Sequence, residues 1–358
     1  MTRRRTLVVV LTALITLASC SEDTDEQARQ PPTKTSAAST TARTGATDTS
    51  AAAGSPGCEG EPPSPGRTVV TVVSDERERT YIRYVPSGLD PSQPAPLVLD
   101  VTAYAPASIE EAFSGFTRPD ADGSVKADEV GAIVVTPEPV NGAGALLTWN
   151  FVGTPGWTDD QRFVTDVLDD VEADACIDTD RVLAMGFAIG GVFASITACG
   201  QADRIAVLVT VAGLYSPDGC RPSEPLPVLS FHGTGDRFVP FDGGVGPGAG
   251  GLGLSAETTT GLVFMASRPG AVASSQAWAD HAGCADGPTD DLKFPGVMRT
   301  AWSRCDDGAD VELYVIDGGE HTWPGSNGMA AYEGLLGPVS DAVVANDVIW
   351  DFFEAHTS

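Results

Sequence analysis

The sequence predicts an α/β fold, with a mostly parallel central sheet that is covered by helices on both faces. Two observations predict it. From residue 58 onward, short β-branched segments alternate with segments of helical periodicity, which is the pattern of strand–helix–strand units. Several of the short segments are continuously apolar, as expected of strands buried on both faces. The length of 358 residues and the hydrophobic content of 42% fit one such domain.

The expected elements begin with a hairpin and end with a helix. Residues 69–73 and 81–85 alternate in polarity and are β-branched, so we expect them to form the hairpin. Further strands are expected where short apolar runs occur, at residues 97–101, 132–136, 181–185, 205–211, 227–231 and 311–316.

Three helices are expected between these strands and after them. Thr158 is a credible N-cap for the first, because Asp159 and Asp160 follow it in the first turn. The apolar residues of that helix recur on one face, namely Phe163, Val164, Val167, Leu168 and Val171. The other two helices are expected at residues 189–199 and 343–353.

The first twenty residues have the features of an export signal. Three arginines at positions 3–5 precede an apolar stretch at residues 7–17, which is too short for a stable membrane-spanning helix. Small residues then precede Cys20, as in a bacterial lipobox, so we expect Cys20 to carry a lipid that anchors the protein to the membrane. The alternative is an ordinary secretory signal with an incidental cysteine. We assign residues 1–20 to a lipoprotein signal peptide.

Residues 21–57 have the composition of a linker. They are rich in Ser, Thr, Ala, Asp and Pro and contain no aromatic, Leu, Ile or Val residue, so they cannot bury enough apolar surface to fold alone. We expect a disordered tether that is followed by one domain at residues 58–358. The formal net charge is −28, from 49 acidic and 21 basic residues, which argues against a nucleic-acid partner.

The cysteines support an extracytoplasmic location. Without Cys20 there are six, an even number that suggests three disulfides in an exported chain: Cys58, Cys176, Cys199, Cys220, Cys284 and Cys305. Cys284 and Cys305 bracket one local excursion and form the best pair, whereas the pairing of the other four stays open. There is no CxxC pair, so the sequence predicts neither a metal site nor a cofactor.

A glycine-rich turn between an expected strand and an expected helix is the first chemical motif. Residues 186–191 read Gly-Phe-Ala-Ile-Gly-Gly, and the spacing matches the nucleophile elbow G-x-S-x-G except that Ala188 occupies the serine position. The alternative is a plain glycine-rich turn of the kind found in nucleotide-binding folds. Residues further along the chain favour the elbow.

Two polar residues follow late strands in the chain order of a hydrolase triad. Asp236 comes shortly after the strand at 227–231, and His321 lies in a glycine-rich loop after the last strand. The order of elbow, acid and histidine is that of α/β-hydrolases. We expect Asp236, His321 and Ala188 to converge at the carboxyl edge of the sheet, as a remnant triad with an inactive nucleophile position. The alternatives are a turn-forming aspartate and a structural loop histidine.

Together these segments resemble a family of esterases. The chain resembles the family of polyhydroxybutyrate depolymerases and feruloyl esterases, which has actinobacterial lipoprotein members. The resemblance rests on these stretches: Arg83–Pro86, Pro96–Asp100, Cys176–Asp178, Val211–Gly213, His232–Asp236, Trp278–Ala279, Gly283–Cys284 and, most specifically, His321–Gly325. It implies an α/β-hydrolase fold, carboxyl-ester substrates, no metal and a Ser-His-Asp triad.

The chain departs from this family pattern at two places. Ala188 replaces the serine, and Thr102-Ala103 replaces the His-Gly pair of the loop that helps to form the oxyanion hole. The backbone N–H of Ile189 is expected to remain as one oxyanion donor. Ser195 lies two helical turns, or about 10 Å, from Ala188 and cannot replace the missing hydroxyl.

The sequence therefore favours an esterase-fold protein that is catalytically impaired and keeps a pocket for an ester, aryl or glycan ligand. One alternative is an active ester hydrolase that uses activated water or the hydroxyl of Thr102. Another is a structural envelope lipoprotein without a ligand. If a ligand binds, four aromatic residues are expected to line one cleft: Tyr104, Trp149, Trp157 and Trp323.

Overall fold

The computed structural model describes most of the chain after residue 53. The described residues are 54–101, 103, 106–143, 146–150, 153–217, 219–248 and 267–357. Cys20, the proposed signal peptide and the linker up to residue 53 lie outside them, as do Thr102 and Tyr104.

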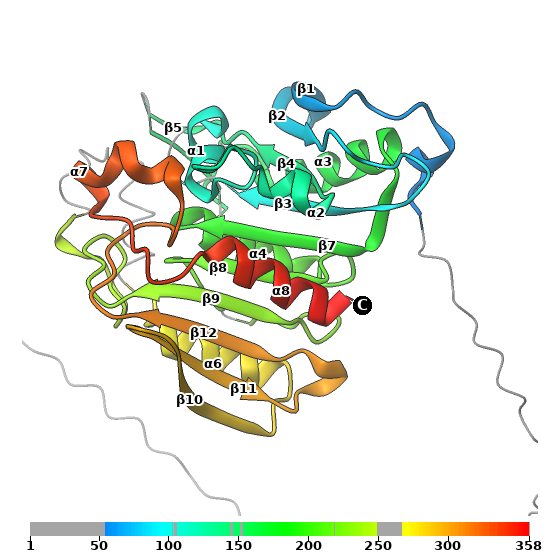
Figure 1. The fold of residues 1–358 in the computed structure, drawn as a ribbon. Coiled ribbons are helices and arrows are strands. Elements are labelled where there is room, and N and C mark those ends of the chain that lie inside the picture. Colours follow the sequence, from blue (N-terminus) through cyan, green and yellow to red (C-terminus); the bar gives the residue numbers. More distant parts are fainter. Residues whose placement is uncertain are drawn as a thin grey trace, which may run out of the picture. The chain divides into compact units, whose positions relative to one another are not determined.

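A large sheet of ten strands forms the centre of the domain, in the order β1-β2-β4-β3-β7-β8-β9-β12-β11-β10 (Figure 1). The strands are β1 (Gly66–Ser74), β2 (Arg77–Val85), β3 (Ala95–Val101), β4 (Ile133–Pro137), β7 (Ile177–Phe187), β8 (Val207–Val211), β9 (Val228–Gly233), β10 (Asp286–Phe294), β11 (Val297–Ser303) and β12 (Val311–Ile316). The strands from β4 to β12 in this order pair in parallel, and the pairs at both ends of the sheet are antiparallel. The predicted mostly parallel sheet is thus confirmed. A separate small hairpin consists of β5 (Asn141–Ala143) and β6 (Leu146–Thr148).

Helices cover both faces of this sheet, as predicted. They are α1 (Ala107–Ser114), α2 (Lys126–Val130), α3 (Asp160–Asp174), α4 (Ile189–Gly200), α6 (Ala271–His281), α7 (Glu333–Leu336) and α8 (Ala345–Thr357). Short 3-10 turns occur at Pro56–Glu59, Asp306–Gly308 and Asn327–Tyr332. In Figure 1, α8 (red) lies in front of the sheet and α6 (yellow) behind it.

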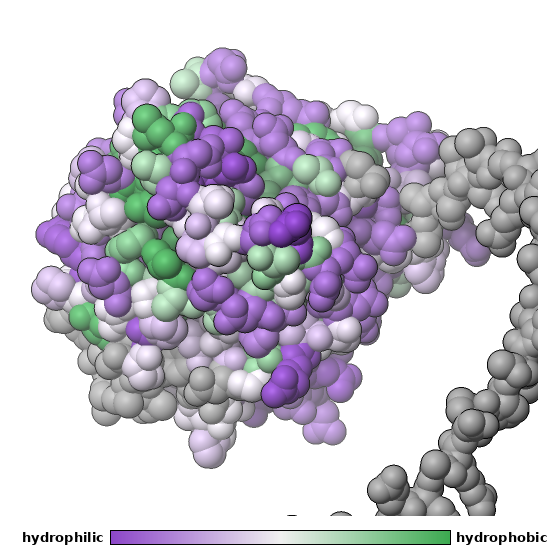
Figure 2. All heavy atoms as spheres, turned by 90° about the horizontal axis from the view of Figure 1, so that it is seen from below, coloured by the Kyte–Doolittle hydropathy of each residue, from purple (hydrophilic) through white to green (hydrophobic). Residues whose placement is uncertain are grey.

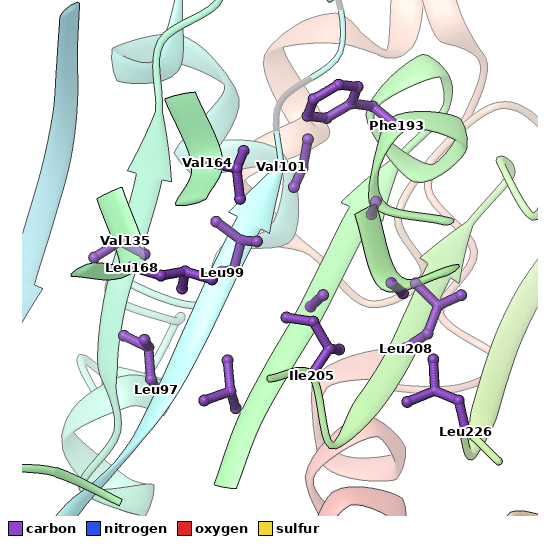
Figure 3. Packing of buried hydrophobic residues seen from close by; sticks show 14 of the residues in the cluster. Leu97, Leu99, Val101, Val135, Val164, Leu168, Phe193, Ile205, Leu208 and Leu226 are labelled. Carbon is purple, nitrogen blue, oxygen red and sulfur yellow. The ribbon is translucent and has the colours of Figure 1, made fainter. Parts of the chain in front are cut away.

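The buried side chains form two main clusters that correspond to these two helical layers. One contains Leu97, Leu99 and Val101 of β3 together with residues of α3, α4 and α6, and Figure 3 shows part of it. The other contains Val98 of the same strand together with residues of α1 and α8. Because successive residues of a strand point to opposite faces, β3 contributes to both clusters. This explains why its sequence is a continuous apolar run.

The first turn of α3 differs from the prediction. Asp159, not Thr158, is the N-cap, and its carboxylate accepts a hydrogen bond from the Arg162 N–H at 3.0 Å. Thr158 is buried, and its hydroxyl group takes part in hydrogen bonds with Asn141 and Asp160. Its side chain is therefore used in tertiary contacts and is not available as a cap.

The domain also begins earlier than predicted, because residues 54–57 pack on it and do not belong to the linker. The Ser55 hydroxyl donates a hydrogen bond to the Ala175 carbonyl at 2.7 Å and accepts one from the Ile177 N–H at 2.9 Å. Gly54 bridges to Asp178, and Gly57 lies so close to Ala175 that a Cβ there would be 2.2 Å from its carbonyl oxygen. Composition alone did not show these long-range backbone contacts.

Three disulfides are present among the described residues. Cys284 is bonded to Cys305, which is the pair that the sequence suggested. The four cysteines left open are paired as Cys58–Cys176 and Cys199–Cys220. Disulfides persist in oxidising compartments, so this pattern is consistent with an extracellular location.

The outer surface of the domain is mainly polar. Figure 2 shows polar side chains (purple) over most of the face seen from below, with apolar side chains (green) in smaller groups between them. Within the described ranges, no helix has the length and apolar character needed to cross a membrane.

Candidate active site

The turn between β7 and α4 has the backbone of a nucleophile elbow. Ala188 has φ 51° and ψ −121°, a conformation that side-chain-bearing residues rarely adopt, and it is the N-cap residue of α4. Its N–H donates a hydrogen bond to the Val211 carbonyl at the end of the neighbouring strand β8, at 2.9 Å. The strained strand-to-helix turn that normally exposes a serine hydroxyl is therefore formed around a methyl group.

Glycines make this turn possible because the backbone segments lie in direct contact. A Cβ on Gly186 would lie 2.5 Å from the Gly190 carbonyl oxygen, and one on Gly213 would lie 2.1 Å from the Ala188 carbonyl oxygen. Both distances are too short for a real side chain. The elbow is thus maintained by backbone packing and does not depend on the chemistry of residue 188.

The loops after β9 and β12 carry the other two predicted residues, Asp236 and His321. Backbone hydrogen bonds join the two loops directly. The strands pair in parallel with Gly233 opposite Ile316, so both loops leave the same carboxyl edge of the sheet. The Thr234 N–H donates to the Ile316 carbonyl at 3.0 Å, and the Gly235 N–H donates to the Gly319 carbonyl at 2.9 Å. These bonds fix the relative position of Asp236 and His321.

Asp236 and His321 form a buried hydrogen-bonded pair, as predicted. His321 Nδ1 lies 2.7 Å from Asp236 Oδ2, and the residues are only 4% and 5% exposed. The other carboxylate oxygen accepts the N–H groups of Phe238 and Val239 at 2.8 and 2.9 Å. Burial alone would raise the pKa of Asp236, but the electrostatic interaction and hydrogen bond with His321 and the bond from Val239 together hold it below the usual value. Asp236 is therefore suited to keep His321 in one tautomer.

A second buried histidine supports the same acid loop. His232, at the end of β9, must donate its Nε2–H to the Val239 carbonyl at 2.8 Å, since a carbonyl can only accept. Its Nε2 is 3.8 Å from Asp236 Oδ2, and its buried Nδ1 has no partner among the described residues. Burial lowers the pKa of His232 to about 4, although Asp236 opposes this shift. His232 is therefore neutral at physiological pH.

Two phenylalanines flank the His321 ring, and the sequence did not identify them. The Phe187 ring centroid is 4.7 Å from that of His321, and the Phe238 centroid is 5.1 Å away. Phe187 directly precedes Ala188, so this contact brings the histidine to the elbow. Among the described residues, His321 Nε2 has no hydrogen-bond partner. Asp236 thus occupies Nδ1 of His321, and Nε2 is the ring nitrogen that it leaves for other interactions.

The predicted oxyanion region is described only in part. The Ile189 N–H begins α4 and has no hydrogen-bond acceptor among the described residues, as an oxyanion donor requires. Ala103 is buried at 4% exposure.

Two of the four aromatic residues predicted to line one cleft, Trp149 and Trp323, are buried in the core instead. Trp149 is fully buried and stacks on Phe193 at 4.6 Å. Trp323 is also fully buried, in the other core cluster, and donates its indole N–H to Asn346 Oδ1 at 3.0 Å. The prediction was wrong for this pair, because their large apolar area fills the two cores. Trp157 is half-buried in a turn.

No metal-binding cluster marks the site in the described part of the chain. No group of three or more His, Cys, Asp or Glu residues there is arranged to hold a metal ion. A cavity of about 140 Å³ lies elsewhere, beside Cys176, and five prolines are among its lining residues. It contains none of the predicted site residues.

Comparisons with known proteins identify the family of this chain. No family model matches the chain. Feruloyl esterase B of Piromyces equi is 29% identical over 198 residues, which are 53% of this chain and 34% of that protein. A probable feruloyl esterase C of Aspergillus terreus is 31% identical over 212 residues, 58% of this chain and 71% of that protein. The chain belongs to the feruloyl esterase family.

This family membership agrees with the α/β-hydrolase fold of the described domain. A solved acetyl xylan esterase from Aspergillus awamori matches 80% of this chain and 99% of its own, with a TM-score of 0.49 and 11% identity. The chain spans about a third of the length of the Piromyces relative, 34%. As a feruloyl esterase family member, it has alanine where the G-x-S-x-G motif of active hydrolases has serine.

Proposed function

We propose that this protein is an exported esterase-family protein that binds a carboxyl ester and is catalytically impaired. The observation that carries the proposal is Ala188, which occupies the strained elbow position with a side chain that cannot attack a carbonyl. Serine hydrolases form a covalent acyl-enzyme through that position. Without an oxygen there, no such intermediate forms.

The remaining groups have clear roles toward a bound ester. In the proposal, Ile189 N–H contacts the carbonyl oxygen of the ligand, and His321 Nε2 faces the carbonyl carbon from the opposite side. Asp236 holds the imidazole through Nδ1. In a serine protease, removal of the nucleophile lowers kcat by a factor of about 10⁶. The rate enhancement that remains over the reaction in water is about 10³–10⁴. The oxyanion donors supply part of this remaining rate enhancement, and in the proposal the Thr102-Ala103 sequence lowers it further.

The ligand class follows from the relatives. The two relatives named above with about 30% identity are a feruloyl esterase and a probable feruloyl esterase. We therefore propose a small-molecule ester, aryl or glycan ligand for this chain. No nucleic acid is proposed, because the net charge of −28 repels phosphate.

The proposed location is the outer face of a cell membrane. The disulfides support export, and the lipobox-like sequence before Cys20 supports a lipid anchor. Cys20→Ala should release the protein from the membrane fraction, as measured by detergent-phase partitioning. Persistent partitioning of the variant would contradict the anchor.

A second function is favoured by the intact acid–histidine pair. The 2.7 Å bond between Asp236 and His321 would also suit a general base that activates water directly. Turnover of p-nitrophenyl acetate and methyl ferulate separates the two proposals. We expect none above background for the natural sequence, whereas turnover that His321→Ala abolishes would establish the water-based mechanism. Absence of both turnover and ligand binding would leave a structural envelope lipoprotein.

A further inference from the structure

Asp100 is a buried carboxyl group that the proposed function does not use. It lies on β3, one residue before the strand ends and leads into the Thr102-Ala103 segment, and it is 5% exposed. The Ser114 hydroxyl of α1 donates to its Oδ2 at 2.7 Å. No ion pair to Asp100 occurs within the described ranges. A buried carboxyl group with so few partners is costly to ionise.

A series of hydrogen bonds continues from Ser114 to the loop that carries His321. The Ser114 carbonyl accepts from Asn346 Nδ2 of α8 at 2.8 Å, and Asn346 Oδ1 accepts the Trp323 indole N–H at 3.0 Å. Trp323 is fully buried and lies two residues after His321. The chain of bonds thus connects the oxyanion strand, two helices and the histidine loop.

The surroundings of Asp100 favour its neutral form. Burial raises its pKa to about 7, the Ser114 hydrogen bond opposes this shift, and the neighbouring Glu111 raises it further. Glu111, on α1, is the titratable group that faces Asp100, and it is itself paired with Arg67 and Arg118 at 3.0 and 2.6 Å. On the neighbouring strands, Met185 of β7 pairs with Asp100 and Val134 of β4 pairs with Val98, and neither residue is titratable. Asp100 therefore changes charge near neutral pH without a compensating cation.

We infer that Asp100 is a positioning residue that couples the end of β3 to the His321 loop through Ser114, and that this coupling changes when the carboxyl group ionises. The inference rests on the proposed function only in treating that loop as part of the ligand site. Its consequence is a site whose geometry depends on pH through a residue that does not touch the ligand.

The test compares the natural protein with Asp100→Asn, which keeps an acceptor for Ser114 but cannot ionise. The Asp100 carboxyl is easier to protonate in the folded than in the unfolded state, so stability should fall as pH rises from about 4 to 7. Relative to Asp100→Asn, the unfolding equilibrium constant of the natural protein should increase by up to about 10³-fold over this range. Urea unfolding at each pH measures it. A ratio that does not change with pH would overturn the inference.

The coupling itself is tested by NMR at Trp323. The variant Trp323→Phe identifies the indole N–H resonance of this residue, because the resonance disappears from its spectrum. In the natural protein the chemical shift of this resonance should change with pH near neutrality. Asp100→Asn should remove that change. Ser114→Ala should also remove it while leaving the pH dependence of stability, because the link is cut but Asp100 still ionises. A response that persists in either variant would refute the coupling.

Asp122→Asn is the matched control. Asp122 accepts the Ser124 hydroxyl at the same 2.7 Å but is exposed, so neither measurement should change. No ligand is used in either measurement. A protein that binds no ester can therefore still satisfy this test, and failure here leaves the proposed function untouched.

Discussion

The elbow and the acid–histidine loops belong to the same candidate site but are held in place by different means. The elbow depends on backbone contacts, such as those of Gly186 with Gly190, and it keeps its strained shape around Ala188. The acid loop depends on its side chains, because Asp236 accepts two backbone N–H groups of its own loop as well as His321. Loss of the serine oxygen therefore leaves the elbow intact, whereas loss of the aspartate would disturb the fold. Retention of Asp236 has a structural reason that is independent of catalysis.

The largest expected effect follows from restoring the missing oxygen. Ala188→Ser should permit labelling by a fluorophosphonate probe and some turnover of p-nitrophenyl acetate, because Asp236 and His321 are already in place. A nucleophile is worth about 10⁶ in kcat in a serine protease, and we expect a partial rescue here because the oxyanion loop has diverged. Labelling is measured by mass spectrometry of the modified peptide. The double variant Ala188→Ser/His321→Gln is the control and should not be labelled, and labelling of the natural protein would contradict the comparison.

The next effect tests whether the acid loop still supports chemistry once a serine is present. In the Ala188→Ser background, Asp236→Asn should lower kcat by about 10⁴, since the wrong histidine tautomer is then favoured. Asp242→Asn changes an exposed carboxylate of the same loop and should have little effect. Steady-state kinetics of the three variants measures this. Equal losses in both aspartate variants would show that loop stability, not the tautomer, is responsible.

Repair of the oxyanion loop should have a smaller effect. Adding Thr102→His and Ala103→Gly to Ala188→Ser should raise kcat by about 10²–10³, which is the value of one oxyanion donor. The same two changes in the natural protein should produce no turnover, because no nucleophile is present. If the repaired variant is no faster than Ala188→Ser alone, the weak activity has another cause.

The acid loop should also be sensitive to acid through His232. Its pKa of about 4 in the folded protein lies below its ordinary value of 6.5, so the unfolded chain binds the extra proton first. Stability should therefore fall as pH decreases from 6.5 to 4, by about 3 kcal/mol from this group. His232→Gln keeps a donor for Val239 and should lose less stability over this range in urea unfolding. Equal acid sensitivity of both proteins would exclude His232 as the cause.

The smallest effect concerns the strain at the elbow. Ala188→Gly should stabilise the protein by up to about 1 kcal/mol, because glycine adopts a positive φ without a Cβ clash. Glycine also makes the unfolded chain more flexible, which offsets part of the gain. Thermal unfolding measures the difference, and Ala194→Gly, in the middle of α4, is a control expected to destabilise. A clear loss of stability in Ala188→Gly would mean that the elbow is not strained.

The sequence predicted the central strands well because they are continuous apolar runs. The strand expected at residues 311–316 is β12, and the expected hairpin is β1 and β2. It did not predict β10, in which eight of nine residues are exposed and no apolar pattern remains. The short helices α1 and α2 were missed for a similar reason, since five to eight residues show too little periodicity.

The candidate site was predictable where a motif specifies it and not where burial does. Asp236 and His321 follow from the chain order of the hydrolase motifs, and the structure joins them. Trp149 and Trp323 lie near loops in the sequence, but tertiary packing buries both. Asp100 is hidden within an apolar run, and only the helix packed over it shows that its carboxyl group is buried.

The Cys58–Cys176 disulfide determines how a mechanical load would enter the domain. Cys176 directly precedes β7, the strand that ends beside Ala188, and Gly54 and Ser55 are bonded to the same strand. Tension applied to the chain ahead of Gly54 would therefore pass through a covalent bond into the middle of the sheet. It would not peel the β1–β2 hairpin from the edge. A domain linked in this way can bear a load at its N-terminal end while the carboxyl edge of its sheet keeps its shape.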